Sequence, residues 1–212
     1  MSTVVAIDGP AGAGKSTVAR MVADRLNYAY INTGSLYRAL AYAAMTSGIA
    51  FSEITPEFLE GLHLEFRGAD LFLNDKKLVS ELRQPECAKG ASIISAQPFI
   101  RDFLMPVQRE SAAKQWIVME GRDIGTVVFP DAEKKFFVTA SAEERARRRM
   151  AQSSEVASGA TFESILADIK ARDERDMNRA IAPLRQAEDA ILVDTTDLSI
   201  DQVVEKIVDF CR

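Results

Sequence analysis

Thr3-Val4-Val5-Ala6-Ile7-Asp8-Gly9-Pro10-Ala11-Gly12-Ala13-Gly14-Lys15-Ser16 is the stretch that decides the fold. Residues 3–7 form a short, β-branched run that is typical of a buried parallel strand. Residues 9–16 have a glycine, four residues, a second glycine, a lysine and a serine, which is the template of a phosphate-binding loop (P-loop). Apolar residues then recur at helical spacing over residues 15–26. A strand, this loop and a helix in succession predict an α/β sheet.

The loop residues predict a site for the phosphates of a nucleoside triphosphate. Glycines let main-chain N–H groups turn inward around phosphate, and a helix that starts near Lys15 offers the positive end of its dipole to the same anion. Lys15 can neutralise charge between the β- and γ-phosphates, and the Ser16 hydroxyl can hold Mg²⁺. The alternative is a glycine-rich turn without a ligand.

The rest of the chain continues the α/β pattern around a different middle part. We expect strands at 28–31, 116–119, 135–138 and 190–193, and helices at 35–45, 142–150, 162–178 and 200–210. Residues 62–66, 70–73 and 77–79 predict a small antiparallel meander, followed by helices at 85–95 and 98–113. Residues 151–159 are small and polar, which is typical of a mobile segment. We predict a single domain over 1–212, with a lobe inserted at about 50–105.

Composition excludes several classes of function. The net charge of −5 argues against broad binding of a nucleic-acid polymer, which needs a basic face. The single histidine, His63, rules out a multi-histidine zinc site and lies in an apolar stretch where a structural role is expected. The two cysteines are far apart in the sequence, which suggests neither a disulfide framework nor a metal cluster. The N-terminus lacks the pattern of a signal peptide, and no apolar run is long enough to span a bilayer. We therefore expect a cytoplasmic protein without a membrane partner.

Two polar groups follow expected strands, at the edge where open α/β sheets bind ligands. Thr33 and Arg38 could grip an acceptor phosphate, although a helix cap at Thr33 or Ser35 with a surface arginine explains this group equally well. Glu120 could orient a magnesium-bound water, and Arg122 could pair bidentately with phosphate. For this second group, a capped turn with a surface ion pair remains the alternative.

Two arginine-rich segments lie near the C-terminal part of the chain. The first contains Arg145, Arg147, Arg148 and Arg149, and the second contains Arg172, Asp173, Arg175, Asp176 and Arg179. The spacing of four and three places Arg172, Asp176 and Arg179 on one helical face, which could lean over a nucleotide. A solvated face held by i,i+4 ion pairs is the alternative.

Together these motifs resemble bacterial cytidylate kinases (CMP/dCMP kinases) over nearly the full length of the chain. The resemblance is carried by the P-loop, by Thr33-Gly34-Ser35-Leu36-Tyr37-Arg38, by residues 121–132 (GRDIGTVVFPDA), by residues 172–179 (RDERDMNR) and by Ala182-Pro183-Leu184. It implies transfer of the γ-phosphoryl group of ATP to CMP or dCMP with the help of Mg²⁺, in pyrimidine nucleotide metabolism. The P-loop alone is shared with many unrelated proteins, whereas the later blocks are much more specific.

The resemblance also implies a fold and a set of roles. The fold would be a P-loop NTPase-type five-stranded parallel sheet flanked by helices, with a monophosphate-binding lobe and a short lid at about 148–165, in a monomer. ATP would lie on Gly9, Pro10, Ala11, Gly12, Ala13, Gly14, Lys15, Ser16 and Thr17. Lys15, Arg122, Arg179 and the lid arginines Arg148 and Arg149 would be catalytic. The acceptor would be held through its phosphate by Thr33, Arg38, Arg122 and Arg179, through cytosine by Ser92, Arg101 and Asp123, and through the sugar by Arg172 and Asp176. Some members of the family carry aspartate in place of Glu120 and serine in place of Thr33, and both changes keep the chemical group.

Three other functions share some of these features. A P-loop kinase for adenylate, uridylate or shikimate has the same core, but the inserted lobe and the block at 121–123 distinguish the chain from it. A GTPase switch lacks support because we find no Asn/Thr-Lys-x-Asp signature for guanine. A regulator without catalysis is disfavoured by the full set Lys15, Ser16, Arg122 and Arg179.

Overall fold

A five-stranded parallel sheet forms the centre of the molecule. The structure, a computed structural model, describes residues 4–113, 115–151 and 160–212. The strand order is β2-β6-β1-β7-β8, and each neighbouring pair is parallel. The strands are β1 (Val4–Asp8), β2 (Ala29–Asn32), β6 (Ile117–Glu120), β7 (Lys134–Thr139) and β8 (Ile191–Asp194). The fold class predicted from the sequence is confirmed.

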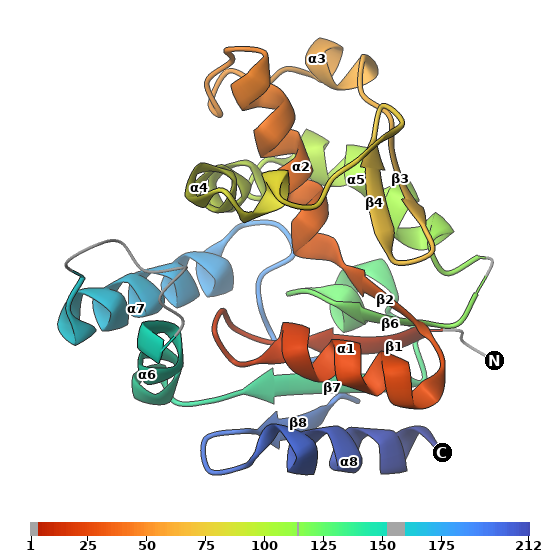
Figure 1. Ribbon diagram of the computed structural model, residues 1–212, viewed down its shortest axis with the longest axis vertical. Coiled ribbons are helices and arrows are strands. Elements are labelled where there is room, and N and C mark those ends of the chain that lie inside the picture. Colours follow the sequence, from red (N-terminus) through yellow and green to blue (C-terminus); the bar gives the residue numbers. More distant parts are fainter. Residues whose placement is uncertain (1–3, 114, 152–159) are drawn as a thin grey trace.

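Alternation along the strands gives the sheet two apolar faces. Val5 and Ile7 of β1 belong to a cluster with valines of α1 (Lys15–Leu26) and α8 (Ile200–Cys211), and Figure 1 shows both helices on the same side of the sheet. Val4 and Ala6 belong to a second cluster on the opposite face, which includes residues of the π-helix η2 (Ile124–Val128). Both faces are therefore covered, as a parallel sheet requires. Among the described residues, no helix is both long and apolar enough to cross a membrane.

A second, smaller sheet lies in the middle of the chain. It has the antiparallel order β3-β4-β5, with β3 (Leu64–Arg67), β4 (Asp70–Leu73) and β5 (Lys76–Lys77), so the expected meander is present. One apolar cluster joins this part to α2 (Thr33–Thr46), and Figure 1 shows the whole group beyond the central sheet. The proposed lobe at about 50–105 thus shares its core with a helix that precedes it. The remaining elements here are α3 (Pro56–Glu60), η1 (Glu81–Arg83), α4 (Pro85–Ile94) and α5 (Pro98–Glu110).

Two helices flank the end of the sheet. α6 (Ala142–Ala151) starts shortly after β7, and α7 (Phe162–Asn178) lies beside it in Figure 1. Ala146 of α6 packs with Ile165 and Ile169 of α7 in a small apolar cluster. The first residue of the expected mobile segment at 151–159, Ala151, is the last residue of α6. The rest of that segment, which is also the middle of the expected lid, 152–159, lies outside the described residues.

Candidate functional site

The P-loop joins β1 to α1 and has the backbone that its glycines permit. Gly9, Gly12 and Gly14 have φ angles of 145°, 76° and 86°, where other residues are strained. A Cβ atom at Gly9 would lie 1.9 Å from the carbonyl oxygen of Val138, so no side chain fits there. Gly14 caps α1 without a side-chain hydrogen bond, which leaves the first-turn N–H groups of α1 available to an anion.

Lys15 is buried inside this loop. Its Nζ donates a 2.7 Å hydrogen bond to the carbonyl oxygen of Pro10. Burial, assisted by the nearby charge of Arg122, holds the pKa of Lys15 well below its ordinary value. A nearby anion would stabilise the charged form of this buried ammonium group. The phosphates of a nucleotide bound in the loop would be such an anion.

Ser16 and Glu120 are connected through a tyrosine that the sequence analysis missed. The Tyr30 hydroxyl makes a close hydrogen bond to the Glu120 carboxylate and a second one with the Ser16 side chain. Asn32 Nδ2 donates to the Tyr30 oxygen over 3.2 Å. A hydroxyl and a carboxylate beside a phosphate site are oxygen donors of the kind that Mg²⁺ prefers, so the residues present fit this ion. Tyr30 was not predicted as a site residue because it fits the pattern of an ordinary strand residue.

Four of the predicted arginines converge near the end of β6. Arg122 Nε donates to Asp176 Oδ2 over 2.9 Å. Burial, together with the charges of Arg122, Arg38 and Arg149, lowers the pKa of Arg172 to about 10. Among the described residues, Arg172 Nε is buried without a hydrogen-bond partner. Gathered cations with an unused donor form an electrostatic site for an anion.

Asp123, Arg101 and Arg179 form a buried group next to these arginines. Arg101 Nη2 makes a close ion pair with Asp123 Oδ2, and Arg179 Nη2 lies 3.5 Å from Asp123 Oδ1. Arg101 and Asp123 are only 4% and 6% exposed. Burial raises the pKa of Asp123, although both arginines oppose the change. A carboxylate and a guanidinium in a dry environment can discriminate strongly between hydrogen-bonding partners.

Three other predicted residues, Ser92, Thr33 and Arg148, lie next to the groups described above or contact other parts of the protein. Ser92 is half-buried on α4, next to the segment whose Ser95 carbonyl accepts a 3.4 Å hydrogen bond from Arg101. The Thr33 hydroxyl donates to the Glu120 carbonyl over 2.8 Å, and the N-cap of α2 is Asn32 rather than Thr33 or Ser35. Arg148 donates to the hydroxyl and carbonyl oxygens of Thr195, at 2.9 and 2.6 Å.

Asp8 is a further buried residue that the sequence analysis missed. Its two carboxylate oxygens accept hydrogen bonds of 2.8 and 2.7 Å from the backbone N–H groups of Ile124 and Gly125. Desolvation raises its pKa to about 6 in spite of these bonds. Asp8 therefore attaches the start of the P-loop to the segment that carries Arg122 and Asp123.

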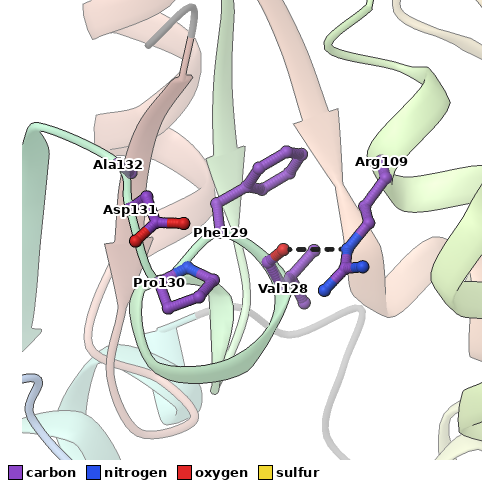
Figure 2. A pocket seen from close by; sticks show the side chains of 6 residues that line it. All are labelled: Arg109, Val128, Phe129, Pro130, Asp131 and Ala132. Carbon is purple, nitrogen blue, oxygen red and sulfur yellow. Dashed lines mark hydrogen bonds between the residues drawn. The ribbon is translucent and has the colours of Figure 1, made fainter.

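A hollow of about 510 Å³ lies elsewhere on the molecule. Figure 2 shows its lining, in which Arg109 Nε donates to the Val128 carbonyl over 3.2 Å. Its other residues, Phe129, Pro130, Asp131 and Ala132, directly precede β7 and so lie toward the amino end of that strand. The P-loop, Thr33 and Arg122 follow the carboxyl ends of β1, β2 and β6, and none of the predicted site residues lines the hollow, so it is not the candidate site.

Comparison with known proteins points to one family. The family described as cytidylate kinase matches residues 5–212. The cytidylate kinase of Thermosipho melanesiensis is 45% identical over 204 residues, which cover 96% of this chain and 94% of that protein. The cytidylate kinase of Exiguobacterium sp. is 45% identical over 212 residues, covering 97% and 95%. Shikimate kinase from Bacteroides thetaiotaomicron has a TM-score of 0.53 at 15% identity, with 98% of this chain and 97% of that one covered, and thus shares the fold.

Proposed function

The chain belongs to the cytidylate kinase family, and on this premise we propose that it transfers the γ-phosphoryl group of ATP to CMP and dCMP, giving CDP or dCDP and ADP. The observation that carries the proposal is the convergence of Arg38, Arg122, Arg149 and Arg172 on one place, with an unused buried donor on Arg172. This cluster gives the acceptor nucleotide, through its phosphate and its sugar, a site of its own that is distinct from the P-loop.

The donor is ATP, and the P-loop residues hold its phosphates. Main-chain N–H groups of residues 9–17, other than Pro10, would surround the β-phosphate, and Lys15 would neutralise charge as it develops on the transferring group. Bound Mg²⁺ would supply further charge neutralisation and would be held by the Ser16 hydroxyl, with the Glu120 carboxylate orienting a magnesium-bound water. Tyr30 keeps these two groups together.

The acceptor phosphate lies on Arg38, Arg122 and Arg179, with the lid arginines Arg148 and Arg149 closing from α6. A phosphate monoester oxygen is already ionised at neutral pH, so the attack on the γ-phosphorus needs no general base from the protein. Alignment and charge neutralisation are the main contributions that a protein makes to this type of transfer. Arg172 and Asp176 would hold the sugar, and Thr33 would support the acceptor site through Glu120.

Cytosine is read by the buried Asp123–Arg101 pair together with Ser92. The amino group at the fourth position of cytosine donates, and the adjacent ring nitrogen accepts, whereas uracil has the opposite pattern. A carboxylate accepts and a guanidinium only donates, so this pair matches cytosine and mismatches uracil. The proposal includes a monomer that acts in the cytoplasm on small nucleotides.

An acceptor panel tests the proposal. Purified protein is assayed for ADP release with ATP, Mg²⁺ and each of CMP, dCMP, UMP, AMP and shikimate. We expect CMP and dCMP to have the highest kcat/KM, with UMP at least tenfold lower because of the mismatched pair. A higher kcat/KM for AMP, UMP or shikimate than for CMP would overturn the assignment.

A further inference from the structure

Arg145 differs from the other arginines of its segment because it points inward. It is 5% exposed, although its charged surroundings are typical of a solvated helix face. Its Nε donates to the Ala140 carbonyl over 2.9 Å, and its Nη1 donates to the Ala11 carbonyl over 3.0 Å. The same guanidinium makes a two-bonded ion pair with Asp173, at 3.0 and 2.6 Å. One side chain on α6 thus holds the end of β7, the P-loop and α7.

The two distant partners of Arg145 belong to opposite halves of the proposed reaction. Ala11 is a P-loop residue of the donor site. Asp173 lies on α7 between Arg172 and Asp176, and Asp176 in turn accepts from Arg122. Polar contacts at both ends of this part of α7 therefore connect the donor loop, through Arg145 and the helix, to the acceptor residue Arg122.

The P-loop backbone at Gly12 also packs closely against Arg145 of α6. A Cβ atom at Gly12 would lie 3.3 Å from Arg145 Cβ, so the loop rests directly on this residue. The Asp173 side chain is 13% exposed and that of Arg145 is 6% exposed, which shields their ion pair from solvent. A planar guanidinium with five donors in fixed directions can hold three separate acceptors in one geometry.

We propose that Arg145, paired with Asp173, is a positioning residue that sets the distance between the donor phosphate loop and the acceptor helix. Its guanidinium is taken up by Ala140, Ala11 and Asp173, so it would act through the P-loop and α7. Phosphoryl transfer depends on in-line alignment, and a displacement of about 1 Å lowers the rate of a well-aligned reaction about 100-fold. Loss of the connection should therefore affect the transfer step more than the binding of either nucleotide alone. This inference rests on the proposed function.

Two variants of different severity test it. Arg145→Lys keeps the charge but has a single nitrogen, which cannot reach the three acceptors together. Asp173→Asn is the milder change, because asparagine has the shape of aspartate and keeps one acceptor oxygen. It provides the test if Arg145→Lys does not fold. Arg147→Gln is the matched control, since Arg147 is exposed on the same helix and pairs with Glu144.

The experiment combines turnover with equilibrium binding. For each variant we expect kcat per folded molecule to fall about 10- to 100-fold with ATP and CMP. The separate affinities for ADP and for CMP, measured by calorimetry, should change less than about threefold. The affinity for a bisubstrate analogue, which joins cytidine to adenosine through five phosphates, should fall at least about tenfold. Arg147→Gln should resemble the wild type.

Two results would overturn the inference. The first is a bisubstrate affinity and a kcat per folded molecule within about twofold of wild type in both variants. The second is a loss of ADP affinity as large as the loss of kcat, because Arg145 would then act on the donor loop alone. Wild-type turnover of CMP in the same assay reports separately on the proposed function.

Discussion

Replacement of Asp8 by asparagine should change how the stability of the protein depends on pH. Burial raises the pKa of this carboxyl group from 3.8 to about 6, against the lowering effect of its hydrogen bonds from Gly125 and Ile124. Between these two values the folded protein keeps a proton that the unfolded chain has already released. Because the folded state then binds more protons, its stability falls as the pH rises through this window.

The magnitude follows from the two pKa values. The interval from 3.8 to about 6, at about 1.4 kcal/mol per pH unit, corresponds to about 3 kcal/mol in total. About 2 kcal/mol of this falls between pH 4.5 and pH 7, where the protein can be studied without strong acid. Asparagine does not titrate, so the Asp8→Asn variant lacks this contribution at every pH.

Urea unfolding at a series of pH values measures the effect. The free energy of unfolding of the wild type minus that of Asp8→Asn should decrease by about 2 kcal/mol from pH 4.5 to pH 7. Thr33→Val is the matched control, since it removes a buried hydrogen bond at the same edge of the sheet without removing a titrating group. Its difference from the wild type should be constant over this range. Parallel curves for the wild type and Asp8→Asn would refute the reasoning.

Four further substitutions test the site. Lys15→Ala should lower turnover at least about 100-fold, and near-normal turnover would contradict the role of Lys15. The variant should melt at or above the wild-type temperature, because burial disfavours the charged side chain that it removes. Asp123→Asn and Arg101→Met should each reduce the ratio of kcat/KM for CMP over UMP by about tenfold or more, and an unchanged ratio in both variants would show that the pair does not read the base. Gly9→Ala should weaken ADP binding at least about tenfold in calorimetry, since its Cβ would collide with Val138; wild-type affinity would argue against the loop geometry.

The parts of the fold that local sequence specifies were predicted well. The P-loop was recognised because its glycines, lysine and serine have a fixed spacing between a strand and a helix. Strand ends moved by only a residue or so, for example from 28–31 to Ala29–Asn32. The π-helix at Ile124–Val128 was missed because its first two N–H groups are held by Asp8, more than 100 residues earlier in the chain.

The inward-facing polar residues were harder to predict than the motif residues. Arg145 and Arg147 have the same composition around them, and only the places of Ala11 and Asp173 in the fold make the first a buried residue. Similarly, Thr33 read as either a cap or a phosphate ligand, whereas its hydroxyl donates to the Glu120 carbonyl on a neighbouring strand. Such roles depend on tertiary contacts, which spacing along the chain does not encode.

Direct identification of the product tests the central claim. Purified protein is incubated with ATP, Mg²⁺ and CMP, and the phosphorus NMR spectrum is followed, with Lys15→Ala under the same conditions as the control. We expect the α- and β-phosphate signals of CDP to appear in step with the loss of the γ-phosphate signal of ATP, and the spectrum of the control to remain nearly unchanged. Release of inorganic phosphate without CDP, or equal formation of CDP by Lys15→Ala, would contradict it.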